Sequence, residues 1–134
     1  MSKDFIHKGR GVSDLKAHLV LVTKYRKKII DKQMLEFLEG VFRRTIEKWE
    51  GRLIEFNGES DHIHVLFQYN PQTELSKLIN NLKTVSSRLT NKEYPERKNW
   101  QGAFWSGSYF IASCGGVTVD KLKEYVQKQE RLNP

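Results

Sequence analysis

Two histidines one residue apart are the first feature of this sequence that could do chemistry. His62 and His64 lie in the run DHIHVLF, residues 61–67, and the whole chain contains 4 histidines. Successive side chains of a strand point to opposite faces, so the two imidazoles should share a face with their Cα atoms about 7 Å apart. Imidazoles at that separation can bind one metal ion, although two solvated histidines on a polar sheet face fit the pattern equally well. The pair alone leaves both interpretations open.

A tyrosine and a glutamine near the end of the sequence form a second spaced pair. Tyr125 and Gln129 are four residues apart in EYVQKQ, residues 124–129, and side chains at that spacing share one edge of a helix. Helical tyrosines pack against a core far more often than they act as nucleophiles. This segment alone therefore does not predict catalysis.

The elements that must position these residues follow from periodicity. Alternation in residues 62–69 places Ile63, Val65, Phe67 and Tyr69 on a core-facing side. Helices are predicted where apolar residues recur at three- and four-residue steps, with Asp31, Thr73 and Thr118 as N-caps. The predicted order is strand 14–24, helix 32–50, strands 52–57 and 62–69 as a hairpin, helix 74–90, strand 103–113 and a last helix. This order predicts an α+β fold, a ferredoxin-like (RRM-like) antiparallel sheet with packed helices and an added C-terminal helix.

Composition places the chain among soluble globular proteins. Its 134 residues fit one domain spanning 1–134, with 38% hydrophobic and 29% charged residues. No apolar run is long enough to cross a membrane, and the start MSKDFIHKGRG lacks the apolar region of a secretory signal. Cys114 is the single cysteine, so neither an internal disulfide nor a thiolate metal site is expected. A cytoplasmic protein is the expectation.

The charge balance is compatible with a polyanionic partner. The net charge is +7 and the isoelectric point about 9.5, which suits nucleic acid and equally suits a basic soluble surface. Four cations surround one tyrosine in KYRKK, residues 24–28, with no acid before Asp31. Charge alone does not separate the two interpretations.

Four motifs in a fixed order resemble a known family. DHIHVLF is followed by LKTVSSRLT, FWSGSYFIAS and LKEYVQKQ, and the set resembles the single-tyrosine HUH transposases of the IS200 type, found in bacterial and archaeal insertion sequences. The resemblance runs from HLVLVTKYRKKI, residues 18–29, to Gln129. One departure is Ser60, where relatives often carry proline; it alters a turn and no catalytic role.

The resemblance implies a catalytic centre and a reaction. Tyr125 matches the nucleophile of the family, and His62, His64 and Gln129 match its metal ligands, with Mg²⁺ or Mn²⁺ as the cofactor and no need for ATP. The implied activity is cleavage and rejoining of single-stranded DNA at insertion-sequence ends through a 5′-phosphotyrosine. In this HUH endonuclease fold the C-terminal helix carries the nucleophile.

The resemblance also implies partners. The family acts on single-stranded DNA with subterminal hairpins and works as a homodimer in which the tyrosine helix serves the partner's histidines. Strand 14–24 is the candidate edge for joining two copies, and the CGG at 114–116 is a candidate hinge. No membrane partner is expected. The candidate DNA contacts are Lys24, Arg26, Lys27, Lys77, Lys83, Arg88, Trp105 and Tyr109.

Three other functions remain open from the sequence. A non-catalytic nucleic-acid-binding module of the same fold would need neither the histidines nor Tyr125. A replication-initiator or relaxase-type nickase would share the chemistry, but the small size argues against it. A domesticated relative that processes chromosomal repeat hairpins would use the same catalytic residues.

Overall fold

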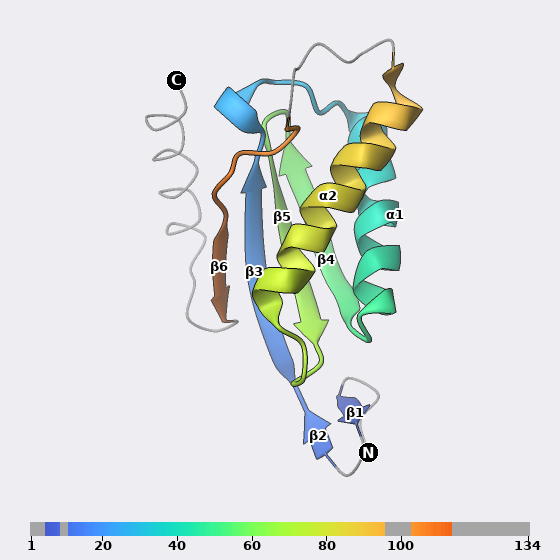
Figure 1. The fold of residues 1–134 in the computed structure, drawn as a ribbon, viewed down its shortest axis with the longest axis vertical. Helices are drawn as coiled ribbons and strands as arrows, with labels where there is room; N and C mark the ends of the chain where they lie inside the picture. The colour runs from blue at the N-terminus through green and yellow to red at the C-terminus, as the bar shows by residue number, and fades with distance from the viewer. Residues whose placement is uncertain (1–4, 9–10, 96–102, 114–134) are drawn as a thin grey trace.

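The computed structural model describes residues 5–8, 11–95 and 103–113, and its centre is a four-stranded antiparallel sheet in the order β4-β5-β3-β6 (Figure 1). A separate two-stranded sheet precedes it. The strands are β1 (Ile6–Lys8), β2 (Gly11–Ser13), β3 (Leu15–Val22), β4 (Arg52–Glu59), β5 (His62–Tyr69) and β6 (Phe110–Ser113). The helices are the 3₁₀ turn η1 (Lys24–Arg26), α1 (Lys32–Lys48) and α2 (Leu75–Glu93).

Both long helices pack on one face of the sheet, called here the helix face (Figure 1). Strand residues and helix residues form one continuous apolar cluster there. From the two central strands it includes Ala17, Leu19, Leu21, Ile63, Val65 and Phe67. The two helices also contact each other, and the Trp49 indole donates to Asn81 Oδ1 at 3.0 Å. The predicted α+β plan of an antiparallel sheet covered by helices is confirmed.

The opposite side of the same strands is the histidine face. Pairing places Val22 beside His62 and Val20 beside His64. No helix in the described ranges packs against it. On this face β3, β5 and β6 contribute His18, Val20, Val22, His62, His64, Leu66 and Phe110. Alternation along β5 therefore directs its apolar residues to the core and its two histidines to the opposite face, as the sequence predicted.

The helix starts are only partly as predicted. Asp31 caps α1, because its Oδ1 accepts from the Met34 N–H at 2.8 Å. The N-cap of α2 is Glu74, with no side-chain cap bond, so the prediction of Thr73 is wrong. Asn70 organises that turn instead, its side chain accepting from the Gln72 N–H and its carbonyl from the Thr73 N–H. An Asx turn of this kind uses the asparagine that precedes the proline.

Two strand predictions need correction. Residues 14–24 were the candidate edge, but β3 lies inside the sheet between β5 and β6, and the edges of the described sheet are β4 and β6. The predicted strand 103–113 pairs continuously only over Phe110–Ser113, with an isolated bridge between Thr23 and Trp105. The Ser-Gly-Ser at 106–108 interrupts the ladder, as glycine in a strand commonly does. The predicted C-terminal helix and the CGG hinge lie outside the described residues.

The described helices show no membrane-spanning character. None of those in the placed part of the chain combines the length and the apolarity that a bilayer crossing requires.

Candidate active site

His62 and His64 lie next to each other on the histidine face, at the start of the interior strand β5. Their ring centroids are 4.9 Å apart and the ring planes are perpendicular. Across the hairpin, Glu59 is the partner of His62 and Asn57 is the partner of His64. The prediction that the two imidazoles share a face is thus confirmed. Their immediate neighbours decide which ring nitrogens are available.

Asp61 fixes the orientation of His62. Its Oδ1 lies 2.8 Å from His62 Nδ1, and both side chains are buried. Burial by itself would raise the pKa of the Asp61 carboxyl, but hydrogen bonds from His62 and Arg26 outweigh it and hold that pKa below its usual value. An ionised carboxylate only accepts, so Nδ1 of His62 must carry the hydrogen. Nε2 is then the nitrogen left to bind a metal.

Arg26 holds Asp61 in turn. The Arg26 Nε donates to Asp61 Oδ2 at 2.8 Å, and Nη2 of the same guanidinium lies 2.7 Å from that oxygen. Asp61 therefore joins the guanidinium on one oxygen to the imidazole on the other. A buried carboxylate needs such partners to offset its loss of hydration. The chain Arg26–Asp61–His62 makes the position of one imidazole rigid.

A turn with unusual backbone angles supports this chain. Tyr25 and Arg26 have φ of 60° and 52°, the left-handed region that side chains other than glycine rarely adopt. Thr23 stabilises the turn, because its hydroxyl donates to the Lys27 carbonyl at 2.8 Å and lies 3.2 Å from the Asp61 carbonyl. Backbone strain of this kind is often found at functional sites. Here it places the Arg26 guanidinium on Asp61.

Gly58 lets the hairpin close next to the histidines. A Cβ at this position would collide with the His62 carbonyl oxygen and would lie 2.9 Å from Ile63 Cα. Only glycine fits where two backbones approach so closely. Gly58 therefore holds β4 against the start of β5, which keeps Glu59 opposite His62.

His64 is half-buried and kept neutral. Burial lowers the pKa of its imidazole below the ordinary value, proximity to His62 lowers it further, and Glu59 opposes the change. Its buried Nδ1 has no hydrogen-bond partner within the described residues. A neutral ring with an unpartnered nitrogen is suited to bind a cation. The donors of the two histidines therefore fit a divalent metal ion.

The pair needs further ligands to hold such an ion. Across the placed residues, no cluster of three or more His, Cys, Asp or Glu side chains could bind a metal by itself. The predicted third ligand Gln129 and the predicted nucleophile Tyr125 lie outside the described residues. Their approach to the histidines remains a prediction.

Sequence reasoning missed the part played by Asp61 and assigned Arg26 to DNA. Neighbouring residues in a strand point to opposite faces, which argues against contact between positions 61 and 62. Asp61 precedes the first residue of β5, so that rule does not apply to it. An acid directly before a histidine at a predicted strand start was the available signal. The DNA contact proposed for Arg26 remains untested, with its guanidinium bound to Asp61.

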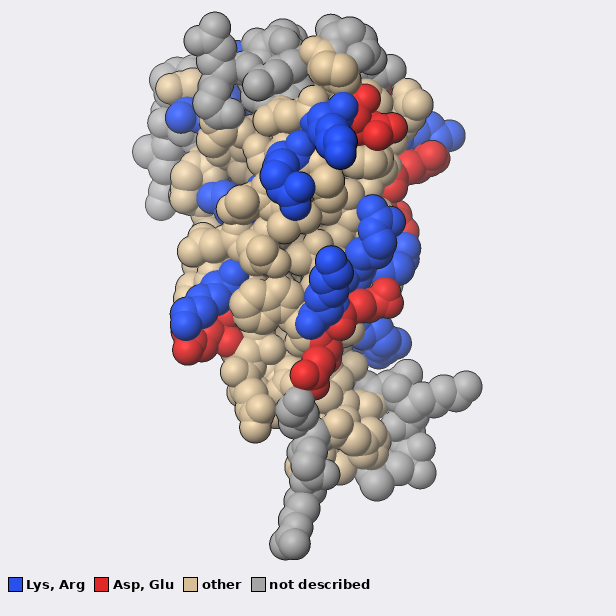
Figure 2. Space-filling model, turned by 45° about the vertical axis from the view of Figure 1, so that its right-hand side comes forward, with Lys and Arg blue, Asp and Glu red and all other residues tan. Residues whose placement is uncertain are grey.

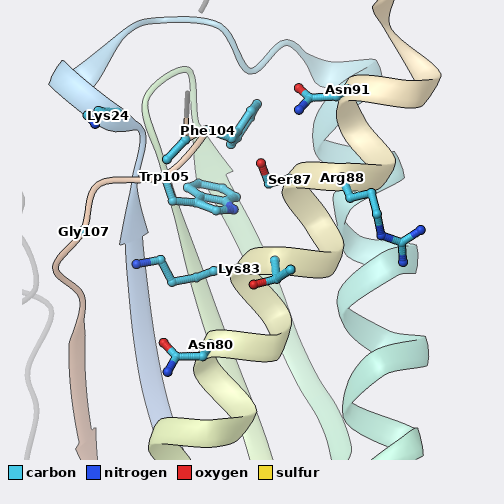
Figure 3. Close-up of a pocket in the computed structure, with 11 residues that line it drawn as sticks. Lys24, Asn80, Lys83, Ser87, Arg88, Asn91, Phe104, Trp105 and Gly107 are labelled. Atoms are coloured by element: carbon cyan, nitrogen blue, oxygen red, sulfur yellow. The ribbon is translucent and has the colours of Figure 1, made fainter. Parts of the chain in front are cut away.

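The other predicted DNA contacts fall into two groups. Lys24, Lys83, Arg88 and Trp105 line one pocket beside α2 (Figure 3). Lys77 pairs with Glu74 at 3.3 Å in the first turn of the same helix. Lys27 is exposed near η1, and Tyr109 packs partly buried against the main core. These four line the same pocket, with the Arg88 guanidinium directed away from Lys83 and Trp105 in Figure 3, and the other predicted contacts lie outside it.

Trp105 contributes to that pocket as a wall. Its side chain is only 2% exposed, and its indole N–H donates to Ser86 Oγ at 2.9 Å. The ring of Phe104 lies against it, with centroids 4.6 Å apart. A ring buried to this extent has little free face on which a base could stack. Its contact with DNA stays a prediction.

Comparison with protein families and sequences gives a consistent result. A family model described as IS200-like transposase matches residues 11–129. The chain is 29% identical over 125 residues to the ISDra2 transposase TnpA of Deinococcus radiodurans, covering 91% of this chain and 89% of that protein. It is 26% identical over 116 residues to the transposase for insertion sequence element IS200 of Salmonella typhimurium, covering 85% and 76%.

Solved structures share the fold. A crystal structure of a Deinococcus radiodurans R1 protein assigned as a transposase superposes with a TM-score of 0.84 at 27% identity, covering 92% of this chain and 97% of that chain. A REP-associated tyrosine transposase bound to a REP hairpin gives a TM-score of 0.59 at 8% identity, covering 96% and 68%. The second likeness shows the fold alone. The family match spans both histidines, Tyr125 and Gln129.

Proposed function

The chain belongs to the IS200-like transposase family, and on that premise we propose that it cuts and rejoins single-stranded DNA through a 5′-phosphotyrosine on Tyr125. The observation that carries the proposal is the Asp61–His62–His64 arrangement on the histidine face. It holds two imidazoles together, His62 with its Nδ1 on Asp61 and His64 with a pKa that burial lowers. A nucleic-acid-binding module without catalysis would have no use for that arrangement.

The proposed roles follow from the chemistry of each side chain. His62, His64 and Gln129 would hold Mg²⁺ or Mn²⁺, a mixed nitrogen and oxygen set that leaves positions open for substrate. When bound, the ion would polarise a non-bridging oxygen of the scissile phosphate. Asp61 would orient the His62 ring through its hydrogen bond to Nδ1, and Arg26 would hold Asp61 in place, so that Nε2 of His62 faces the metal. Tyr125 supplies the attacking oxygen.

The reaction exchanges one phosphate ester bond for another and hydrolyses none. The Tyr125 phenol oxygen loses its proton and forms a bond to phosphorus, the bond from phosphorus to the 3′ oxygen breaks, and that oxygen takes up a proton to leave a free 3′-OH. The 5′ side stays attached to the enzyme as a phosphotyrosine, which retains the energy of the broken bond. Attack by a second 3′-OH restores a phosphodiester and frees the tyrosine. No ATP is required.

The pKa of an ordinary tyrosine explains why positioning matters. An ordinary phenol titrates near pH 10, so a tyrosine is a poor nucleophile at neutral pH unless it is aligned with a polarised phosphate. Holding nucleophile and phosphate in line can supply much of the rate. The His62 imidazole, held by Asp61 and Arg26, is the part of that alignment to which the described residues contribute.

The proposed partners are DNA hairpins and a second copy of the chain. One structural neighbour is bound to a REP hairpin, and a net charge of +7 suits a polyanion. By resemblance, the protein would recognise single-stranded DNA with subterminal hairpins as a homodimer, with the tyrosine helix acting in trans. A domesticated repeat-processing enzyme would use the same residues on a different hairpin.

Covalent capture of DNA tests the proposal. The protein is incubated with Mn²⁺ and single-stranded oligonucleotides from its own genomic flanks, and adducts are separated on a denaturing gel. We expect an adduct that Tyr125→Phe abolishes and His64→Ala sharply reduces. Tyr69→Phe and His7→Ala are matched controls away from the site and should retain the adduct. An adduct that survives Tyr125→Phe would refute the nucleophile assignment, and no adduct with any flank would favour a binding module.

A further inference from the structure

A second polar site lies on the opposite side of the sheet from the histidines. A pocket of about 680 Å³ opens between α2, the start of η1 and the segment 103–107 (Figure 3). Its size is within the range of ligand-binding clefts. The lining residues are Lys24, Asn80, Lys83, Thr84, Ser87, Arg88, Asn91, Ala103, Phe104, Trp105 and Gly107.

The described part of the lining has one sign of charge. It contains three cations, two hydroxyls and two amides, and none of these described residues is acidic. Lys83 is held in the wall, where its Nζ donates to the Ser106 carbonyl at 2.9 Å. Burial lowers the pKa of this ammonium, which a bound anion would counteract. Hydroxyls, amides and cations are the groups that contact phosphate and sugar oxygens.

A solvated helix surface is the plain alternative, and α1 shows what such a surface looks like. Its exposed side interleaves both signs, with Glu36, Glu39 and Glu47 among its lysines and arginines. Arg43 there pairs with Glu39 at 3.1 Å. When the side that carries α1 is turned forward, Figure 2 shows basic and acidic side chains interspersed. In α2, by contrast, no acid occurs from Leu75 to Lys92.

The polar residues of α2 form a continuous line. Asn80, Thr84, Ser87 and Asn91 follow each other at three- and four-residue steps, so they share one edge of the helix. From first to last the edge measures about 16 Å at the rise of an α-helix. A line of that length is suited to several consecutive units of a polymer, which a small anion would not require.

We propose that this pocket binds a short stretch of the sugar–phosphate backbone of single-stranded DNA, as a contact site separate from the histidine face. The inference rests on the proposed function, which supplies DNA as the substrate. Lys24 and Arg88 pair with phosphates, Thr84 and Ser87 donate to their oxygens, and the buried rings of Phe104 and Trp105 form the wall behind them.

The turn η1 connects this pocket to the histidines. Lys24 lines the pocket, and Arg26, two residues later, binds Asp61 beside His62. A strand held in the pocket therefore lies against the same three-residue turn that supports the catalytic pair. The pocket therefore lies where it can bind the DNA that flanks the scissile phosphate.

Salt-dependent binding separates a phosphate site from a solvated surface. Affinity for a fluorescein-labelled single-stranded oligonucleotide is measured by anisotropy over a range of salt, with EDTA present to prevent cleavage. For single strands each phosphate contact contributes about 0.7 to the slope of log K against log salt. Arg88→Ala should therefore reduce the slope by about 0.7, and affinity at low salt should fall about fivefold. Thr84→Glu should weaken binding further, because it places a carboxylate in the line.

Arg44→Ala is the matched control, because Arg44 is an exposed arginine on α1 outside the pocket. It should change neither the slope nor the low-salt affinity. If Arg88→Ala and Thr84→Glu bind like Arg44→Ala, the pocket is not a DNA site. If poly-glutamate displaces the oligonucleotide as effectively as unlabelled DNA does, the site prefers acidic protein, which also overturns the proposal.

The outcome is independent of the cleavage chemistry. A wild-type protein that forms no covalent adduct but shows the Arg88-dependent slope would refute the proposed function and leave this site standing. If the wild-type protein forms the adduct but Arg88→Ala keeps the full salt slope, the proposed function stands and the DNA site in this pocket is refuted.

Discussion

The two faces of the central sheet are made by the same strands but are organised in opposite ways. On the helix face, Ile63, Val65 and Phe67 of β5 are almost completely buried in the apolar core. On the histidine face, His62 is bound by a carboxylate and His64 retains a nitrogen without a described partner. One face stabilises the fold, and the other holds side chains in states that cost stability. The difference predicts that substitutions on the helix face lower the free energy of unfolding, whereas substitutions on the histidine face change metal affinity and the state of the imidazoles.

The largest effect is expected from Phe67→Ala on the helix face. Phe67 is fully buried, and removing such a ring costs about 3–5 kcal/mol of unfolding free energy. Its neighbour Leu66 faces the other way and is only half-buried, so Leu66→Ala should cost about 1 kcal/mol. Urea denaturation of both variants checks this. Equal losses of unfolding free energy in the two variants would mean that both faces are equally packed, which would contradict the difference described above.

A smaller effect, of another kind, is expected from Asp61→Asn. The variant removes the negative charge that fixes His62 and pairs with Arg26, and loss of such a supporting partner typically weakens metal binding about 10- to 100-fold. Mn²⁺ titration followed by electron paramagnetic resonance measures the affinity directly. Nitrogen-15 NMR of the imidazoles should show His62 losing its fixed Nδ1–H tautomer.

Asp14→Asn is the control for that change. Asp14 also accepts side-chain hydrogen bonds, from Gln68 and Lys16, but it is exposed and far along the sheet from His62. It should leave Mn²⁺ affinity and the His62 tautomer unchanged. If Mn²⁺ affinity falls equally in both variants, the effect of Asp61→Asn comes from the loss of one negative charge and not from the hydrogen bond to His62.

The smallest effect is a pH dependence that comes from His64. Its pKa in the folded protein is below the ordinary value of 6.5, so the unfolded chain binds a proton first as the pH falls. The stabilisation is therefore complete above about pH 6.5 and declines as the pH falls from there towards the folded pKa. Denaturation of the metal-free protein at a series of pH values should show this decline, and His64→Gln should remove it. A decline of the same size in His64→Gln would assign it to another group.

The sequence predicted the layers of the molecule better than it predicted their contacts. Alternation in residues 62–69 and the apolar stripes of the long helices are local patterns, and the structure confirms them except in the second half of α2, where Ser86 and Thr90 are buried in place of Val85 and Leu89. That β3 is an interior strand depends on pairing with β5 and with β6, which lie far along the chain, and periodicity does not report such pairing. Local patterns specify faces, and long-range pairing specifies neighbours.

The same limit applies to the site. The spacing of His62 and His64 placed both on one face, but the Arg26–Asp61 ion pair joins residues 35 apart in sequence. It depends on a left-handed turn at Tyr25 and Arg26 that their residue types do not suggest. Trp105 was assigned to DNA because an aromatic ring can stack on bases, yet it is buried with its N–H on Ser86. Exposure of an aromatic side chain is decided by packing, which composition does not reveal.

The central claim is that Tyr125 becomes joined to the 5′ end of a cleaved strand. Trypsin digestion of the covalent adduct followed by mass spectrometry tests it directly, because Tyr125 lies in the short peptide EYVQK, residues 124–128. The account predicts that this peptide carries the 5′-phosphorylated nucleotide and that every other tyrosine peptide is unmodified. A nucleotide on the exposed Tyr25, or a linkage through the 3′ phosphate, would contradict it.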